Sequence, residues 1–143
     1  MRHVAVGLLL LGMACSTGPG LPPAIPEGTW GGDDAGLLLS ATAAHVHVGC
    51  TQGNFSAPIP VGGDGRFTAE GRYSHLHELY PVGTGQSHPA ILSGRLVGDA
   101  RLTFSVRVTD GGEEYGPVEV HRGVEPAMQN CPICRLPESE KAP

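Results

Sequence analysis

Two histidine pairs carry the residue types and spacing that best fit metal chemistry. His45 and His47 are separated by one residue, as are His75 and His77, so the two imidazoles of each pair lie on the same face of a β-strand. Together the pairs could bind Zn²⁺ or Cu²⁺, because such a site needs three or four ligands. Further histidines that could join them are His88 and His121.

The strand around the first pair also fits an ordinary core strand. In the stretch 44–50 the histidines alternate with two valines and Cys50, and this aliphatic side is expected to face the core. The first pair then faces solvent, whereas His75 alternates onto an apolar face, so the two pairs would lie on opposite sides of the sheet. We therefore expect no resident cofactor, with zinc or copper as the alternative.

The cysteines are a second group of chemically reactive residues. Cys131 and Cys134 have the spacing of redox and zinc motifs, but a redox pair begins a helix, and no helix is predicted there. In an oxidising compartment a disulfide is expected instead. We predict that Cys50 is joined to Cys134, with Cys131 as the alternative partner. Such a bridge closes a loop of roughly 80 residues and contributes about 4 kcal/mol.

The N-terminus has the features of an export signal. A basic start at Arg2 precedes an apolar run over 4–11 that is too short to span a bilayer, and small residues then lead to Cys15. This segment resembles the signal peptide of a bacterial lipoprotein, with Gly12 at the position where that family usually has Leu. The resemblance implies cleavage before Cys15, acylation of its thiol and, because Ser16 follows, transfer to the outer membrane. An ordinary cleaved signal peptide is the alternative.

Composition and charge indicate a β-rich domain in an acidic chain. The 143 residues include 22 Gly and 13 Pro, and 16% are charged, which is typical of short strands joined by tight turns. The net charge of −5 becomes −6 when Arg2 is removed, which argues against a nucleic-acid partner and leaves the lipid as the contact with the membrane. The expected segments are a signal peptide (1–14), a lipid-anchored Pro/Gly linker (15–26), a β-domain (27–134) and a flexible tail (135–143).

Alternating apolar residues predict a series of short strands. Residues 28–41 are expected to form one bent strand, or two strands separated at Gly31-Gly32. Further strands are expected over 44–50, 54–59, 66–77, 89–97, 101–109 and 115–122. Because the connections are short, sequential strands should pair antiparallel. The predicted fold is all-β, an antiparallel up-and-down meander of seven or eight strands closed into a small barrel, with a β-sandwich as the alternative.

A small barrel could enclose a ligand. Gly28-Thr29-Trp30 resembles the Gly-x-Trp that opens the first strand of lipocalin- and avidin-like barrels, and the resemblance favours a barrel. Aromatic side chains would line a cavity for a small apolar ligand, but in so small a barrel they could equally fill the interior. The side chains concerned are Trp30, Phe67, Tyr73 and Phe104.

The sequence contains no known catalytic motif. Nucleophile-elbow, zinc-protease and phosphate-loop patterns are absent, and the adjacent carboxylates Asp33-Asp34 and Glu113-Glu114 should point in opposite directions. We therefore expect a non-catalytic binding or structural module, anchored by lipid in the bacterial cell envelope and facing the periplasm or the cell surface. The alternatives are a lipocalin-like carrier of a small apolar ligand and a metal-binding envelope protein that uses the histidine pairs. Its partner would be another envelope protein or the carried ligand.

Overall fold

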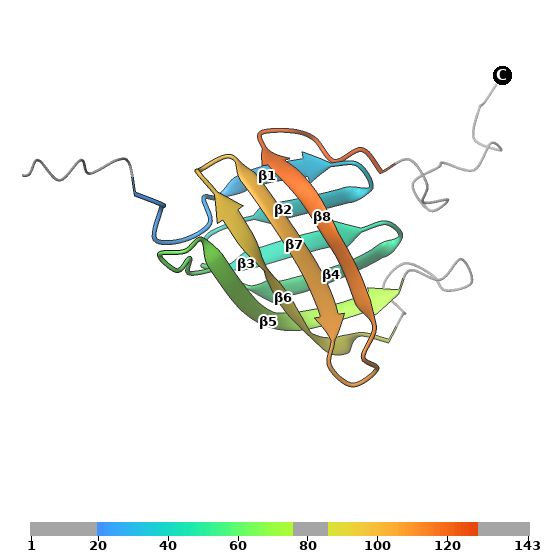
Figure 1. Ribbon diagram of the computed structural model, residues 1–143. Coiled ribbons are helices and arrows are strands. Elements are labelled where there is room, and N and C mark those ends of the chain that lie inside the picture. Colours follow the sequence, from blue (N-terminus) through green and yellow to red (C-terminus); the bar gives the residue numbers. More distant parts are fainter. Residues whose placement is uncertain (1–19, 76–85, 129–143) are drawn as a thin grey trace, which may run out of the picture.

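The computed structural model describes residues 20–75 and 86–128, which form a closed barrel of antiparallel strands (Figure 1). Each strand pairs with the next one along the chain, and the last pairs with the first, so the predicted up-and-down barrel is confirmed and its sandwich alternative is not the fold. No helix in these two ranges is long and apolar enough to cross a bilayer. The strands are β1 (Gly28–Gly32), β2 (Ala35–Leu39), β3 (Ala43–Val48), β4 (Thr51–Ser56), β5 (Arg66–His75), β6 (His88–Val97), β7 (Arg101–Val108) and β8 (Glu114–Arg122).

Two chain reversals lie elsewhere than the sequence indicated. The stretch 28–41 is two strands, but they are separated at Asp33-Asp34 and not at the glycines, and Asp34 takes the left-handed φ of 51° that Asp tolerates in turns. The predicted strand 44–50 ends at Val48, so Cys50 lies in the β3–β4 turn beside Gly49, whose φ is 55°. The next strand therefore starts at Thr51 and not at residue 54.

Glycines on the inner face of the barrel make room for aromatic rings. Gly53 falls in the predicted connection between the strands 44–50 and 54–59, but it lies in β4 opposite Tyr73. A Cβ atom at Gly53 would meet the tyrosine ring. A Cβ at Gly71 would lie 2.6 Å from Phe55 Cδ1, and a Cβ at Gly94 would lie 2.7 Å from Phe67 Cζ. Neighbouring aromatic rings therefore take the space that side chains at these glycines would need, and the rings help to fill the interior.

The C-terminal segment packs along the outside of the barrel, next to the place where β1 and β8 close it. β1 and β8 pair at Trp30 with Arg122 and at Gly31 with His121, and the chain then continues along β1. In residues 123–127, which we call the strap, Gly123 N–H donates to the Thr29 carbonyl and Ala127 N–H donates to the Gly32 carbonyl. The strap lies over Gly31 and Gly36, which face outward and carry no side chain that could hold it away.

A side chain at Gly36 is expected to lift the strap from the barrel. A Cβ atom at this position would lie 2.5 Å from Pro126 Cγ, so Gly36→Val should lower the free energy of unfolding by about 1–3 kcal/mol in urea titrations. Hydrogen exchange at the amides of Asp34 and Ala127, which take part in strap hydrogen bonds, should become faster. The matched control is Gly63→Val in an exposed turn with open space around the glycine; equal effects of the two substitutions would contradict this account.

The N-terminal segment reaches the barrel at the end formed by the β2–β3, β4–β5 and β6–β7 connections (Figure 1). Within the predicted linker, Ile25 N–H donates to the Ile59 carbonyl at 3.0 Å, and Val61 N–H donates to the Pro23 carbonyl at 3.0 Å. Ile25 is buried in the core, so the last residues of the predicted linker pack against the barrel. We call this the entry end of the barrel.

Candidate functional site

The first histidine pair lies on the outer face of the barrel, and Val46 between the two histidines is fully buried, as the alternation predicted. His45 Nδ1 lies 2.8 Å from Asn54 Oδ1, so this nitrogen donates its proton to the amide oxygen. His45 Nε2 then accepts a hydrogen bond from His47 Nε2, also at 2.8 Å. Burial lowers the pKa of His47, as does, to a smaller degree, the charge of His45, which favours a neutral imidazole.

The other histidines are not brought to this pair. The backbone of His75 pairs with Thr51, its side chain and His77 lie outside the described residues, and the second histidine pair therefore stays a prediction. His88 contacts Asp110, and His121 contacts Glu119. In the part of the chain that the structure describes, no group of three or more His, Cys, Asp or Glu side chains could hold a metal ion.

The predicted lipidation and disulfide sites lie mostly outside the described residues. Cys15, Cys131 and Cys134 fall in segments that the structure does not describe, so acylation and the bridge to Cys50 stay predictions. One observation bears on the bridge. Ala127, four residues before Cys131, accepts a hydrogen bond from Asp34 N–H, and the Asp34 carbonyl accepts one from Gly49 N–H next to Cys50. The strap therefore leads toward the turn that holds Cys50.

The aromatic residues predicted to line a cavity are all buried in the core. Trp30 is 0% exposed, and its indole N–H donates to the Pro26 carbonyl at 3.1 Å. Phe67 and Phe104 back an open groove of about 530 Å³ on the outer wall of β5, β6 and β7. Arginines and hydroxyl groups lie along that groove, but most of the area of its lining is apolar. Its polar lining consists of Arg66, Thr68, Ser93, Arg95, Thr103 and Ser105.

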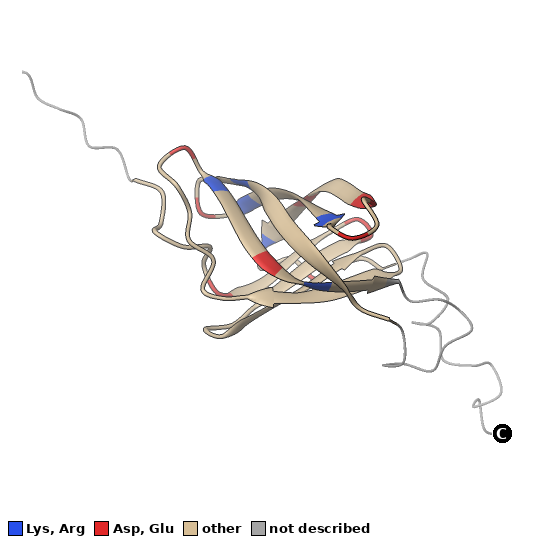
Figure 2. Ribbon diagram, turned by 90° about the horizontal axis from the view of Figure 1, so that it is seen from below, with Lys and Arg blue, Asp and Glu red and all other residues tan. Residues whose placement is uncertain are grey.

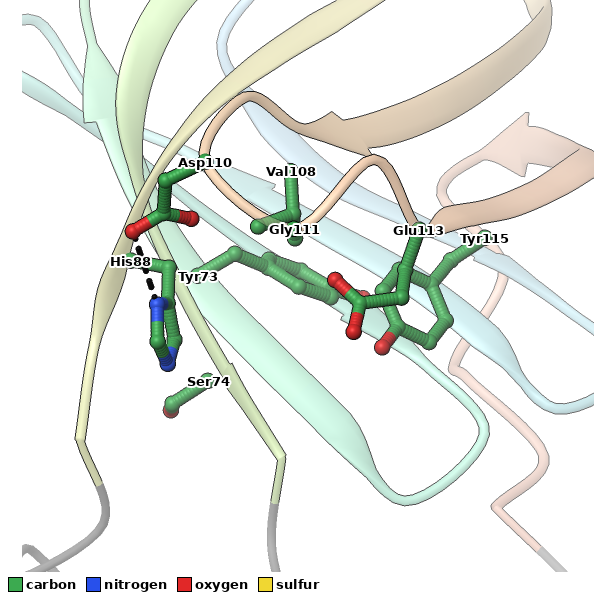
Figure 3. Close-up of a pocket in the computed structure, with 8 residues that line it drawn as sticks. All are labelled: Tyr73, Ser74, His88, Val108, Asp110, Gly111, Glu113 and Tyr115. Carbon is green, nitrogen blue, oxygen red and sulfur yellow. Dashed lines mark hydrogen bonds and ion pairs between the residues drawn. The ribbon is translucent and has the colours of Figure 1, made fainter.

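Tyr73 lines the pocket that best fits a binding site (Figure 3). Its lining residues come from the end of β5, the start of β6 and the β7–β8 turn, which lie at the opposite end of the barrel from the entry end. This end pocket has a volume of about 170 Å³. It is formed where the β7–β8 turn passes over the ends of β5 and β6, and the turn is closed by a hydrogen bond from Gly112 N–H to the Val108 carbonyl at 3.0 Å. The lining residues are Tyr73, Ser74, His88, Val108, Asp110, Gly111, Glu113 and Tyr115.

The floor of the end pocket is fixed by a buried hydroxyl network. The Thr51 hydroxyl donates its one proton to the Val48 carbonyl at 2.5 Å, so the Tyr73 hydroxyl must donate to Thr51 Oγ1, 2.7 Å away. Burial raises the pKa of Tyr73 to about 12, and the hydrogen bond between Tyr73 and Thr51 does not cancel that effect. The Tyr73 ring is therefore held rigidly and stays neutral.

The wall of the end pocket carries a histidine–carboxylate pair. His88 Nδ1 lies 3.0 Å from Asp110 Oδ2, and this hydrogen bond lowers the pKa of the Asp110 carboxyl below its usual value. Ser74 also lines the pocket, but its hydroxyl donates to the Gln52 carbonyl at 3.5 Å. Ser74 follows the inward-facing Tyr73, which is in register with His88, so the serine alternates away from the histidine. These residues therefore do not form a Ser–His–Asp triad in the described geometry.

The sequence contains no motif that would indicate most of this pocket. Glu113 and Glu114 were predicted to diverge, and they do: Glu113 lines the pocket, while Glu114 is in register with Arg107 outside it. His88 begins β6, whereas Asp110 and Tyr115 belong to the β7–β8 turn and the start of β8, about 22 residues or more further along the chain. Only the turn signal of Asp110-Gly111-Gly112 could have indicated where this end of the barrel lies.

Charge is distributed unevenly along the barrel axis (Figure 2). The turns beside the end pocket carry carboxylates at Asp33, Asp34, Asp110, Glu113 and Glu114. The arginines at this end are Arg72 and Arg107, near the ends of β5 and β7. At the entry end, arginines are mixed with acids, and these arginines are Arg66, Arg95, Arg101 and Arg122. The pocket therefore lies in the more acidic half of the molecule.

Fold and site together define a small closed meander barrel with aromatic rings packed in its interior and a pocket at one end. Comparisons with protein-family models, with curated proteins and with solved structures give no match for this chain. The function of the chain is therefore inferred from its own residues.

Proposed function

We propose that this chain is a lipid-anchored, non-catalytic binding module of the bacterial cell envelope, and that the end pocket is its recognition site. The observation that carries the proposal is the position of the pocket. It lies at the end of the barrel opposite to the one that the N-terminal segment enters. A barrel tethered through Cys15 would therefore hold its entry end toward the membrane and its pocket away from it.

The length of the tether supports this arrangement. Between Cys15 and Pro23, where the chain first pairs with the barrel, an extended chain spans at most about 30 Å. Proline and glycine in this stretch favour an extended segment. A module on such a tether stays close to the bilayer and presents its far end to a partner in the periplasm or at the cell surface.

Binding at the end pocket is better supported than a carrier role. A carrier of a drug-sized apolar ligand needs a cavity of roughly 300 Å³ or more, whereas the end pocket measures about 170 Å³ and is partly lined by charged groups. The outer groove is large enough, but it lies open on the outer wall of the barrel, where an apolar ligand would stay largely exposed to water. Catalysis is not proposed, because the His88–Asp110 pair has no nucleophile bonded to it among the described residues.

The anchor is tested by Cys15→Ala in a Gram-negative host. We expect the wild-type chain in the membrane fraction and the variant in the soluble periplasmic fraction, since the acyl chains supply the membrane contact. Cys50→Ala serves as the matched control and should leave the chain in the membrane fraction. A Cys15→Ala variant that stays with the membrane would show that the lipoprotein hypothesis is wrong.

The recognition site is tested by photo-cross-linking in intact cells. A photoreactive p-benzoylphenylalanine in place of Glu114, exposed beside the end pocket, should give a discrete cross-linked product. The same group in place of Asp99, exposed in the β6–β7 turn at the entry end, is the control and should not give that product. A product obtained from the Asp99 position alone would refute the end pocket as the recognition site.

A second candidate function, metal binding, is favoured by one distance. The Nε2 atoms of His45 and His47 lie 2.8 Å apart. When the proton of His47 moves from Nε2 to Nδ1, the hydrogen bond between the two Nε2 atoms is lost and both atoms can act as ligands. Two nitrogens on adjacent corners of a square-planar ion lie about 2.9 Å apart when each bond is about 2.0–2.1 Å, a geometry that suits Cu²⁺. Calorimetric titration with Cu²⁺ should then give one site that His47→Gln removes, while His121→Gln, which changes a distant exposed histidine, should not affect it. Binding that survives His47→Gln would exclude this function.

A further inference from the structure

The end pocket combines aromatic rings with carboxylates in a space of side-chain size. The ring centroids of Tyr73 and Tyr115 are 5.2 Å apart, and the ring planes are tilted by 40°. Figure 3 shows the Glu113 carboxylate lying beside the Tyr115 ring, with the two tyrosines on the same side of the pocket. A volume of about 170 Å³ is too small for a drug-sized ligand, so the pocket admits a head group or a single side chain.

The charges around this pocket favour a cation. The hydrogen bond from His88 keeps the Asp110 carboxyl ionised, because it lowers the pKa of that group. Burial raises the pKa of Tyr115, and the Glu113 charge raises it further, so the Tyr115 ring stays a neutral phenol with an electron-rich face. His88 is the basic group among the described lining residues, and its Nδ1 proton is already donated to Asp110. The charge of Arg72, which is not part of the lining, also helps to lower the pKa of Asp110, and the Arg72 guanidinium donates to the Ser87 hydroxyl.

The β7–β8 turn places the Glu113 carboxylate at the pocket. Val108 N–H donates to the Glu113 carbonyl at 2.8 Å, and the Glu113 carboxylate folds back over Gly111, where a Cβ atom would meet it. The carboxylate is exposed at the mouth of the pocket, and it lines the pocket together with the tyrosine rings. A carboxylate beside aromatic faces is an arrangement that recognises ammonium and guanidinium groups.

We propose that the end pocket binds a compact organic cation, an alkylammonium or guanidinium group, between the rings of Tyr73 and Tyr115 and the carboxylates of Asp110 and Glu113. This inference rests on the proposed function, because it names the chemistry of the group that the module recognises. The cation belongs either to a free amine or to a Lys or Arg side chain of a partner protein. Both sources share the charge and shape that the pocket would recognise.

The test is an NMR titration of the folded full-length chain with choline and with its neutral isostere 3,3-dimethylbutan-1-ol. Choline should shift the ring resonances of Tyr73 and Tyr115 saturably and bind at least about 5-fold more tightly than the alcohol, because only the cation gains the cation–π and carboxylate attraction. N-acetyl-arginine amide and N-acetyl-lysine amide form the second arm. Tighter binding of these amides than of choline indicates a protein side chain as the natural source. Equal affinity for choline and the alcohol overturns the proposal.

Two matched variants locate the cation. Glu113→Gln should weaken choline binding by about 3- to 5-fold, while Glu114→Gln, which changes the next carboxylate outside the pocket, should leave it unchanged. Equal effects of the two substitutions would overturn the assignment. This outcome can be distinguished from that of the proposed function. Cross-linking at the pocket end without cation binding overturns only the cation chemistry. Cation binding without cross-linking overturns only the role as an envelope module.

Discussion

Replacing Trp30 with alanine should lower the free energy of unfolding by about 3–5 kcal/mol. The side chain is completely buried, and it is the largest in the core. It lies in β1 in register with Leu37 on β2 and with Arg122 on β8, so it sits where the barrel closes. Its indole N–H also ties β1 to the Pro26 carbonyl of the incoming chain. A cavity at this position therefore weakens both closure and the docking of the N-terminal segment.

The measurement is urea unfolding followed by circular dichroism, because Trp30 is the only tryptophan and its fluorescence is lost in the variant. Since domains of this size have total stabilities of about 5–15 kcal/mol, the loss would be a large fraction of the total. Leu38→Ala on the neighbouring strand is the control, because Leu38 is 58% exposed and should change stability by less than about 0.5 kcal/mol. If Trp30→Ala lowers the free energy of unfolding by less than about 1 kcal/mol, the Trp30 side chain does not stabilise the β1–β8 closure of the barrel.

The barrel could be predicted from the sequence because its signals are local. Strands such as β7 alternate apolar and polar residues with period two, and short turns leave sequential pairing as the simple solution. The boundaries near Gly53 could not be predicted, because a glycine in the middle of a strand looks like a turn until the aromatic residue opposite it is known. That partner, Tyr73, is 20 residues further along the chain.

The end pocket could not be predicted for the same reason. His45 and His47 could be identified as a candidate pair because they are close in sequence. His88 and Asp110 form a pair only through the register of β6 and the position of the β7–β8 turn. The antiparallel registers of β5, β6 and β7 bring the end of β5, the start of β6 and the end of β7 to one rim. Proximity in sequence thus identified a surface pair, while the candidate site depends on contacts between distant segments.

The buried phenol of Tyr73 should make the stability of the barrel depend on pH in the alkaline range. Its pKa is raised from the ordinary value of 10.0 to about 12. Between these two values the native state keeps the phenol proton that the unfolded chain has lost. The native state thus binds more protons, and stability must fall as pH rises. The free energy of unfolding contributed by Tyr73 is fully present below pH 10.0 and should decrease by about 2 kcal/mol up to pH 12.

The variant Tyr73→Phe isolates this effect, because every other titrating group is shared with the wild type. We expect the variant to lose about 1 kcal/mol near neutral pH, where the hydrogen bond to Thr51 is missing, and to lack the additional alkaline loss. The stability difference between the two chains should therefore shrink and then reverse as pH approaches 12. Tyr115→Phe is the control, since Tyr115 is only partly buried and its contribution should be smaller. Parallel pH profiles for wild type and Tyr73→Phe would show that the Tyr73 hydroxyl reaches solvent, and the rigid floor assigned to the end pocket would then be wrong.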